Sequence, residues 1–251
     1  MIAQAFKTRK VIARACSIFE LLDEAIFDMP EKSIMVVASK VVSLCEGRVV
    51  AKEGTDLQTL VRREAEEYMP DAHAQHHGYT FTVAYNMLTP NSGIDESNAD
   101  GDYVLWPADP QQSANDIREY LCQRFKRQDI GVVISDGSFI PLRWGSVGLT
   151  LAYSGFEPVR WYSEQTDLFG RPLRYTRTNI MDSLATTATL LMGEGAEQTP
   201  LVLLSDLPPI VFQRRNPTAE ELAGLRASLE DDTYAPMLQA VTWQKGGRAK
   251  E

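Results

Sequence analysis

The sequence predicts an α+β protein in which mixed sheets pack against helices. Two patterns lead to this class: segments with apolar residues at helical spacing, and short runs of β-branched and other apolar residues that are typical of strands. These segments follow one another without a regular β-α-β repeat, which favours the α+β class over the α/β class. The chain has 251 residues, of which 44% are hydrophobic, so it can bury a core in one large or two small domains.

The first helix is predicted over residues 17–29. Ser17 is a typical capping residue, Glu20 stands three residues later as in a capping box, and Pro30 ends the helix. The next predicted elements are a buried strand over 34–38, a charged surface helix over 57–68, a strand over 81–88 and a short strand over 103–106.

A second helix with strong start signals begins at Pro110. Asp109 caps it, proline is well tolerated at the first helical position, and Gln112 is placed to reach back to the cap. Its predicted buried stripe consists of Ile117, Leu121, Cys122 and Phe125. The elements predicted after it are strands over 131–135, 149–153 and 201–204.

Two further helices are predicted near the C-terminus. Thr178 or Asn179 opens the first, and Gly193 ends it, as glycine commonly does at a helix C-terminus. Thr218 and Glu221 form a capping box for the second, over residues 219–229. Because the intervening Pro208-Pro209 pair breaks the chain, we predict a catalytic domain over 1–207, with a possible division into two subdomains, and a helical extension over 208–251.

Charge and cysteine content exclude several classes of protein. The net charge of −9 argues against broad binding to nucleic acid or to an anionic membrane, and no apolar run approaches the roughly 20 residues that span a bilayer. Cys16, Cys45 and Cys122 are too widely spaced for a zinc site or a disulfide framework, and the N-terminus does not resemble a secretory signal. We therefore predict a cytoplasmic protein.

Acidic residues in glycine- and serine-rich turns are the main functional signal. Asp95 and Asn98 share one such turn, Asp136 follows a β-branched run, and Glu194 stands between two glycines. Carboxylates in this setting suit Mg²⁺ or Mn²⁺ held against phosphate oxygens, and glycines let phosphate approach the backbone. A purely local role stays open, because such an Asp often binds its own backbone and a Glu after a helix often faces water.

Several short motifs together resemble the gamma-glutamyl ligase family of the deazaflavin coenzyme F-420. They appear in family order over about residues 30–205. The matching segments are Ala38-Ser-Lys-Val-Val-Ser43, Glu46-Gly-Arg48, Gly93-Ile-Asp-Glu-Ser-Asn98, Trp106-Pro-Ala-Asp-Pro110, Ile134-Ser-Asp136, Pro141-Leu-Arg143, Phe169-Gly-Arg-Pro-Leu173 and Met192-Gly-Glu194. The resemblance implies a gamma-glutamyl ligase-like fold in an intertwined homodimer, and an ATP- or GTP-dependent enzyme with a pair of Mg²⁺ or Mn²⁺ ions.

The resemblance also assigns roles to residues. Asp95 and Asp136 match ligands of the first metal, and Glu194 looks like a ligand of the second. Arg143 matches an arginine that would clamp phosphate or carboxylate beside Asp136 in the catalytic centre. The residues assigned to the nucleotide are Ser39, Lys40, Asn98, Gly193, Gly195 and Gln198.

This chain departs from the family pattern near the reacting groups. Leu44 stands where the family usually has Lys, Gly137 where it has Thr, and Gly148 where it has Asp. The family's N-terminal Leu-Pro nucleotide motif is absent. These departures, with motifs such as Ser-Gly-Phe-Glu-Pro158, resemble a divergent bacterial branch assigned to folate metabolism.

The function predicted first is therefore the addition of L-glutamate to a folate, through an acyl phosphate formed at the expense of the nucleotide. The same ligation on the deazaflavin precursor or another carboxylate is the alternative. A second alternative is a non-catalytic descendant that binds nucleotide and regulates another process. The residues do not distinguish ATP from GTP or Mg²⁺ from Mn²⁺, and they do not predict the number of glutamates added.

Other conspicuous residues have an ordinary structural interpretation beside a functional one. His73, His76 and His77 share a loop that could bind a metal but lacks spaced carboxylates. Cys45 is more typical of a packed thiol than of a reactive one. Aromatic side chains at 153, 161, 162 and 169 could stack on a ring or serve packing. The arginines at 160, 171, 174 and 177 could hold a polyglutamate tail or offset the acidic surface.

Overall fold

The computed structural model describes residues 1–70 and 78–249. The chain forms two compact units, each built from two stretches of sequence. The first unit consists of Met1–Glu46 and Pro107–Asn216, and the second consists of Gly47–Trp106 and Pro217–Glu251. Contacts in space do not test which segments fold independently, so the predicted boundary at residue 207 stays a prediction.

A five-stranded mixed sheet forms the centre of the first unit. Within this sheet, β2 and β8 are parallel, and Ala38 lies opposite Ser135. The other neighbouring strands of the sheet are antiparallel. The strand order is β1 (Ile2–Phe6), β12 (Leu201–Ser205), β2 (Ser33–Ala38), β8 (Ile130–Phe139) and β9 (Ser146–Ser154). Because β2 and β8 run side by side in the same direction, the residues after both strands emerge at one edge of the sheet.

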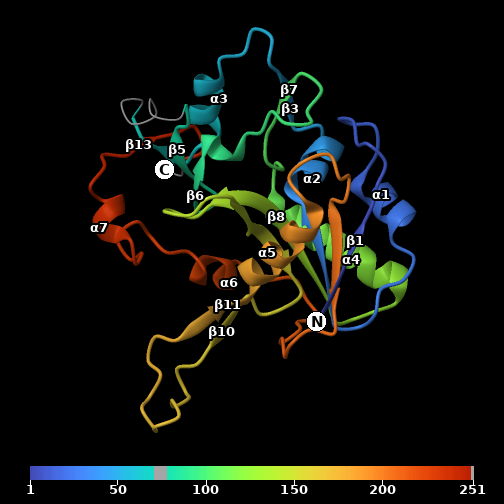
Figure 1. Ribbon diagram of the computed structural model, residues 1–251, viewed down its shortest axis with the longest axis vertical. Helices are drawn as coiled ribbons and strands as arrows, with labels where there is room; N and C mark the ends of the chain where they lie inside the picture. The colour runs from blue at the N-terminus through green and yellow to red at the C-terminus, as the bar shows by residue number, and fades with distance from the viewer. Residues whose placement is uncertain (71–77, 250–251) are drawn as a thin grey trace. The chain divides into compact units, whose positions relative to one another are not determined.

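Helices cover the sheet of the first unit (Figure 1). Helix α1 (Ile18–Ala25) and α4 (Pro110–Phe125) pack Leu21, Leu22, Ile117 and Leu121 against alternate residues of β2, β8 and β12. Each of these side chains contributes about 1.5–3 kcal/mol by leaving water. Helix α5 (Ile180–Met192) packs against β9 and β8, and α2 (Ser39–Glu46) follows β2 directly.

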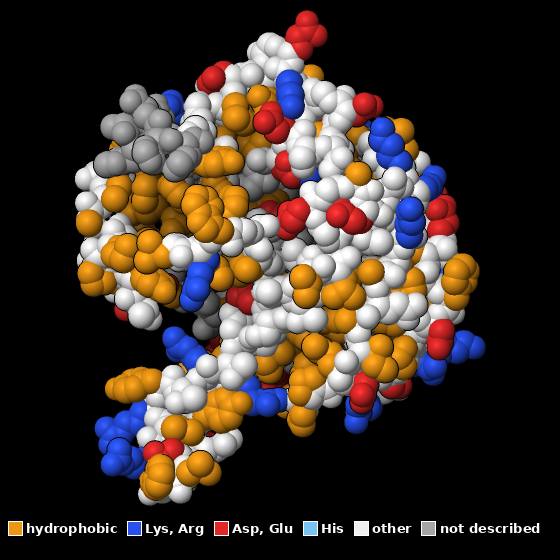
Figure 2. Space-filling view, in the orientation of Figure 1, with side chains coloured by type: hydrophobic (Ala, Val, Ile, Leu, Met, Phe, Trp, Pro, Cys, Tyr) orange, Lys and Arg blue, Asp and Glu red, His pale blue; other side chains and the backbone are white. Residues whose placement is uncertain are grey.

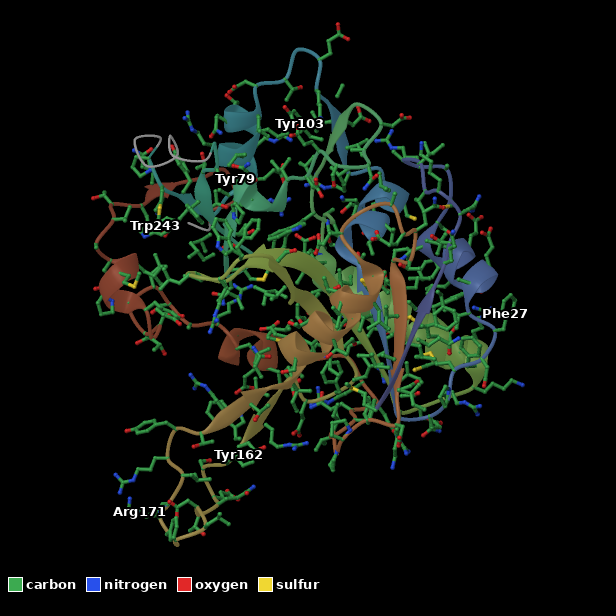
Figure 3. The ribbon with its side chains drawn as sticks, in the orientation of Figure 1. Phe27, Tyr79, Tyr103, Tyr162, Arg171 and Trp243 are labelled. Atoms are coloured by element: carbon green, nitrogen blue, oxygen red, sulfur yellow. The ribbon has the colours of Figure 1, made fainter. Side chains whose placement is uncertain are left out.

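An arm projects from the first unit between β9 and α5. Its base is the antiparallel pair β10 (Val159–Trp161) and β11 (Arg177–Asn179). The loop beyond this pair begins near Tyr162 and carries Arg171 toward its tip (Figure 3). The arm therefore holds several of the aromatic and arginine residues that the sequence marks as conspicuous.

The second unit contains two small sheets. One has the order β13 (Gln244–Lys245), β4 (Glu67–Tyr68), β5 (Phe81–Ala84) and β6 (Met87–Pro90), and the other pairs β3 (Val49–Ala51) with β7 (Asp102–Val104). Its helices are α3 (Leu57–Glu64), the short 3₁₀ helix η2 (Asn91–Gly93), α6 (Ala219–Gly224) and α7 (Ala235–Leu238). The C-terminal stretch thus adds a strand to a sheet that begins much earlier in the chain.

The mixed α+β class and most helix starts are confirmed. Ser17 and Glu20 form the predicted capping box of α1, and the Asp109 side chain accepts the backbone N–H of Gln112 at the start of α4. Thr218 and Glu221 form the capping box of α6. The side chain of Gln112 itself does not reach back but donates to Asp116. None of the described helices is long and apolar enough to cross a membrane.

Several predicted boundaries are wrong. The strand predicted over 81–88 is a hairpin, because Tyr85 and Asn86 both adopt positive φ and turn β5 into β6. The helices predicted over 57–68 and 219–229 end at Glu64 and Gly224. The strand predicted over 131–135 continues to Phe139 as half of a long hairpin with β9, so Asp136 lies within β8 and not in a loop after it.

Candidate functional site

The parallel strands β2 and β8 bring the predicted residues Ser39 and Asp136 together. Ser39, the first residue of α2, donates its hydroxyl to Asp136 Oδ1 at 2.6 Å. The side chains meet because Ala38 and Ser135, the residues just before them, are opposite each other in the sheet. Ser39 is buried, whereas Asp136 is half-buried and keeps one side toward solvent. This edge of the sheet therefore presents a fixed carboxylate and hydroxyl, where open sheets commonly bind ligands.

A β-bulge lies directly beside Asp136. The β8–β9 register shifts between Ile134 and Ser135, and Leu151 of β9 is left without a partner in the ladder. A bulge bends the strand and changes the direction of the side chains beyond it. The continuously buried part of β8, Ile130 to Ser135, ends here, so the long strand passes from the core into a more exposed hairpin that begins with Asp136.

Glu194 lies beside the same strand. Ser146 of β9 donates its hydroxyl to Glu194 Oε1 at 2.8 Å. A methyl group placed on Gly137 would be 3.7 Å from Oε1 and 3.8 Å from Oε2 of Glu194. The Glu194 carboxylate therefore faces the residue that follows Asp136, and the structure brings two of the predicted metal ligands to one strand.

Helix α5 and its C-terminal cap determine where Glu194 lies. Asn179 caps the start of α5 by accepting the backbone N–H of Asp182 at 3.0 Å. At the other end, Gly193 has φ +75° and its N–H bonds Thr189 O, which ends the helix as predicted.

The loop over 193–200 runs beside the end of β2. Ala38 N–H donates to Pro200 O at 2.9 Å, and Thr8 N–H donates to Gln198 O at 2.8 Å. The N–H of Gly195 donates to the Glu197 carboxylate at 2.9 Å. A side chain on Gly193 would meet this same carboxylate at 2.4 Å. The loop that holds the predicted nucleotide residues Gly193, Gly195 and Gln198 therefore ends beside Ala38, the residue before Ser39, and the Glu197 carboxylate contacts its two glycines.

Asp95 and Asn98 belong to the second unit. Asp95 exchanges both backbone hydrogen bonds with Val104, at 3.0 and 2.8 Å, and its Oδ1 accepts the N–H of Ser97 at 2.7 Å. Asn98 has φ +53° in the same turn. The local role expected of an Asp in such a turn is therefore present, and the metal and nucleotide roles of these residues stay predictions.

Lys40 and Arg143 occupy different settings. Lys40 is the second residue of α2 and is half-buried beside Ser39. Arg143 is exposed at the tip of the β8–β9 hairpin, where its backbone N–H bonds Ile140 O at 3.2 Å, and its side chain makes no ion pair within the described chain. The predicted clamping role of Arg143 is not tested by this geometry.

The structure gives physical reasons for the departures from the family pattern. Leu44 is 7% exposed on α2, so a lysine ammonium there would have to be buried. A side chain on Gly148 would meet Thr189 Oγ1 at 2.2 Å and Ala185 O at 2.5 Å, because α5 packs directly on β9. Gly137 has room for a side chain. The packing around Leu44 and Gly148 therefore accounts for two of the three departures.

The oxygen donors at this edge suit a hard divalent cation. Asp136 and Glu194 are carboxylates, Ser39 and Ser146 are hydroxyls in contact with them, and Mg²⁺ and Mn²⁺ prefer such ligands. Among residues 1–70 and 78–249, no group of three or more aspartate, glutamate, histidine or cysteine side chains is arranged so that it could hold a metal ion. The predicted alternative at His73, His76 and His77 lies outside the described residues.

Two partners of the site were missed from the sequence. Ser146 is 48 residues from Glu194, and it becomes recognisable only once β9 is aligned with β8. Glu197 stands close to Gly195, and the run Gly193-Glu-Gly-Ala-Glu197 could have suggested a carboxylate folding back onto glycine N–H groups.

Several known proteins are similar to this chain over most of its length. Residues 13–206 match the profile of the family described as F420-0:Gamma-glutamyl ligase. A relative named coenzyme F420:L-glutamate ligase from Methanococcus maripaludis strain C7 is 32% identical over 72% of this chain and 79% of its own length. Proteins of the same name from M. maripaludis strain S2 and from Methanothermobacter thermautotrophicus are each 31% identical, over 82% and 76% of this chain and 86% and 81% of their own lengths. The chain therefore belongs to the F420-0:gamma-glutamyl ligase family.

Proposed function

We propose that this protein is a gamma-glutamyl ligase that joins the amine of L-glutamate to a carboxylate of a deazaflavin coenzyme precursor. The observation that carries the proposal is the Ser39–Asp136 contact at the ends of β2 and β8, with Glu194 beside the same strand. The acceptor follows the printed names of the relatives, which state coenzyme F420. These names favour the second of the two acceptors weighed from the sequence over the folate that was predicted first.

The reaction requires activation of a carboxylate, because a carboxylate does not react directly with an amine. We propose that a carboxylate oxygen of the acceptor attacks the γ-phosphorus of ATP or GTP, and that the nucleoside diphosphate leaves. The glutamate amine then attacks the acyl carbon, phosphate leaves with the bonding electron pair, and the amine loses a proton to solvent. Most of the catalysis comes from positioning and from neutralising phosphate charge.

The residues at the sheet edge of the first unit fit these tasks. Asp136 and Glu194 would hold Mg²⁺ or Mn²⁺, and the family resemblance proposes Asp95 of the second unit as a further ligand. The bound ions would neutralise the phosphate oxygens of the nucleotide. Ser39 holds the Asp136 carboxylate in one orientation through the 2.6 Å hydrogen bond. The Gly195 N–H can donate to a phosphate only when the Glu197 carboxylate moves aside.

We also propose that the protein acts as a homodimer. The hairpin tip and the arm of the first unit expose large apolar side chains beside cations, as Figure 2 shows for the arm. The most exposed are Leu142, Trp144, Leu168, Phe169 and Tyr175. Contiguous exposed apolar surface commonly marks a protein interface. Light scattering should give a dimer mass for the wild type and a monomer mass for the double variant Leu168→Ser and Phe169→Ser.

Mass spectrometry of the products decides the acceptor. The enzyme is incubated with glutamate, Mg²⁺ or Mn²⁺, and ATP or GTP, together with either the deazaflavin precursor or tetrahydrofolate. A glutamyl unit added to the deazaflavin precursor supports the proposal. Addition to tetrahydrofolate alone would show that the acceptor is a folate. Nucleotide binding without any glutamyl product would favour the non-catalytic regulator.

Substitution of Asp136 tests the assignment of the site. Asp136→Asn keeps the size of the side chain and an acceptor for Ser39, but removes the charge that holds a cation. We expect kcat to fall by about a hundredfold or more, several kcal/mol of transition-state stabilisation. Asp116→Asn, on the exposed side of α4, is the control with the same charge change and should leave turnover unchanged. Near-normal turnover of Asp136→Asn would show that the metal assignment is wrong.

A further inference from the structure

The turn that carries Asp95 is built on three consecutive residues with positive φ. Asn91, Ser92 and Gly93 have φ +51°, +55° and +69°. Left-handed backbone at non-glycine residues is unfavourable and persists only where the surroundings hold it. The conformation of the 91–98 turn must therefore be maintained by contacts from the rest of the second unit.

Buried hydrogen bonds provide part of this support. Thr80 N–H donates to Asn91 Oδ1, and Ser92 N–H donates to Thr82 Oγ1, both at 2.9 Å. The Ser92 hydroxyl donates to Val61 O at 2.9 Å. These contacts fix the start of the turn but do not involve the stretch that contains Asp95.

Trp106 covers the middle of the turn. A side chain on Gly93 would lie 2.0 to 2.4 Å from atoms of the Trp106 indole, so the ring lies directly against this glycine. The ring is 5% exposed, and the Tyr85 ring packs edge-on against it with centroids 5.9 Å apart. The position of the indole thus determines where the backbone leading to Asp95 can lie.

Arg248 contacts Tyr85 and Glu64, and each of these residues leads to Trp106. It donates to the Tyr85 hydroxyl, and its guanidinium lies 5.0 Å from the centre of the Tyr85 ring. It also donates to Glu64 Oε2 at 2.6 Å. Glu64 is 8% exposed and accepts from Arg48 at 2.8 Å, and Arg48 Nε donates to the backbone oxygen of Trp106 at 3.1 Å. One guanidinium is therefore connected to the ring and to the backbone of Trp106.

The C-terminal segment holds Arg248 in place through its backbone. The N–H groups of Gly246, Gly247 and Arg248 donate to the carbonyls of Glu66, Arg62 and Ala65, each at 2.9 Å. A side chain on Gly246 would meet Ala65 O at 2.3 Å, so this close approach requires glycine. The segment lies beyond residue 206, where the match to the family profile ends.

We propose that Arg248 is a positioning residue for the 91–98 turn, acting through Tyr85 and Trp106 on the backbone that presents Asp95 and Asn98. The functional half of this inference rests on the proposed ligase function, because it is the cation and nucleotide that would use these two residues. The positional half concerns the fold of the second unit and is measurable without any substrate.

Hydrogen–deuterium exchange of the full-length protein tests the positional half. Arg248→Met keeps a long side chain but loses the charge and the hydrogen bonds. Exchange at the amides of Ser92, Ile94, Asp95 and Val104 should become about tenfold faster, while amides of β8 in the first unit keep their rates. Arg226→Met, an exposed arginine in the same C-terminal stretch, is the control and should change neither. Equal rates in Arg248→Met and the control would overturn the inference, even if the wild type is an active ligase.

A second variant covers the case in which Arg248→Met fails to fold. Tyr85→Phe keeps the ring against Trp106 and removes only the hydroxyl that accepts from Arg248. We expect a smaller acceleration, about threefold, at the same amides. Unchanged rates in Tyr85→Phe would overturn the proposed connection from Arg248 through the Tyr85 hydroxyl to Trp106.

Steady-state kinetics test the functional half. In Arg248→Met the KM for Mn²⁺ and for the nucleotide should rise about tenfold with a smaller fall in kcat, and Arg248→Lys should recover part of the loss. A residue that is only structural would lower the unfolding temperature without changing these constants. A wild-type enzyme without glutamyl product would end the ligase proposal, whereas the exchange rates would still decide the positional role.

Discussion

Gly148 and Gly137 lie opposite each other in the β8–β9 ladder and differ in the space around them. A Cβ on Gly148 would overlap Thr189 Oγ1 and the backbone of Ala185, whereas a Cβ on Gly137 would make ordinary contacts at 3.7 to 3.9 Å. The close approach of α5 to β9 therefore depends on one glycine, and the neighbouring glycine is replaceable.

This difference predicts opposite outcomes for two similar substitutions. Gly148→Ala should lower the free energy of unfolding by about 3 kcal/mol, because the backbone carbonyl of Ala185 must move. Gly137→Ala should change it by less than about 1 kcal/mol. Urea denaturation of both variants measures the difference, and equal stabilities would show that α5 does not lie as close to β9 as described.

Cys45 is predicted to react slowly with thiol reagents. Burial, followed by the neighbouring Cys16 thiol 4.0 Å away, raises the pKa of Cys45 to about 12. Almost no thiolate forms near neutral pH, and the thiolate is the reactive species. Alkylation by iodoacetamide at about pH 8 should be many times slower in the folded protein than in urea, as mass spectrometry of the Cys45 peptide would show. Equal rates in both states would contradict the packed, unreactive thiol that the sequence favours.

At the level of single residues, local sequence identified Ser39 and Asp136 because each follows or ends a run of buried strand residues. Their direct contact follows from parallel pairing across 97 positions of sequence, which local patterns do not contain. Ser146 remained unidentified for the same reason. The roles toward ligands that were assigned to all of these site residues, Ser39, Asp136 and Glu194 included, remain predictions.

At the level of elements, side-chain capping made the helix starts the most predictable feature. Ser17, Asp109, Asn179 and Thr218 all cap helices through local hydrogen bonds that are encoded within three residues. The β5–β6 hairpin was not recognised, because Tyr85 and Asn86 make the turn without the glycine that usually marks it. The edge strand β1 and the short strands of the second unit pair with distant segments and carry little signal of their own.

The cap of α4 allows a test within one element. Asp109→Ala removes the side chain that accepts the N–H of Gln112 at 3.0 Å, and should cost about 1 kcal/mol of stability. Asp116→Ala removes the same charge from the same helix but only a surface contact with the Gln112 side chain, and should cost about 0.5 kcal/mol or less. Thermal unfolding of the two variants compares them, and a greater loss in Asp116→Ala would contradict the assigned cap.

At the scale of the whole molecule, the two units differ in how polar groups stabilise them. The first is built around an apolar sheet, whereas the second contains a carboxylate surrounded by arginines. Burial acts to raise the pKa of Glu64, but the hydrogen bond and charge of Arg248 and the charge of Arg48 outweigh it, and the pKa lies below its ordinary value of 4.5. Glu64 thus binds fewer protons in the folded state than in the unfolded chain.

The sign of this shift predicts a stability that falls in acid. The contribution of Glu64 is fully present above its ordinary pKa and is lost as the pH falls through the lowered value in the folded state. Unfolding of the wild type in urea should therefore require less urea at about pH 3 than at about pH 6, and Glu64→Gln should show a smaller difference between the two. The same pH difference in both proteins would assign the acid sensitivity to other carboxylates.

The order in which the segments leave the ribosome follows from the placement of β12 and β13. The strand β12 lies between β1 and β2, so the large sheet is incomplete until Leu201–Ser205 have been translated. The smaller sheet receives β13 only when Gln244–Lys245 have been translated. A stalled nascent chain ending shortly after residue 216 would have every described strand of the first unit and lack β13 of the second, so a premature stop codon between the codons for residues 216 and 244 should damage one unit selectively.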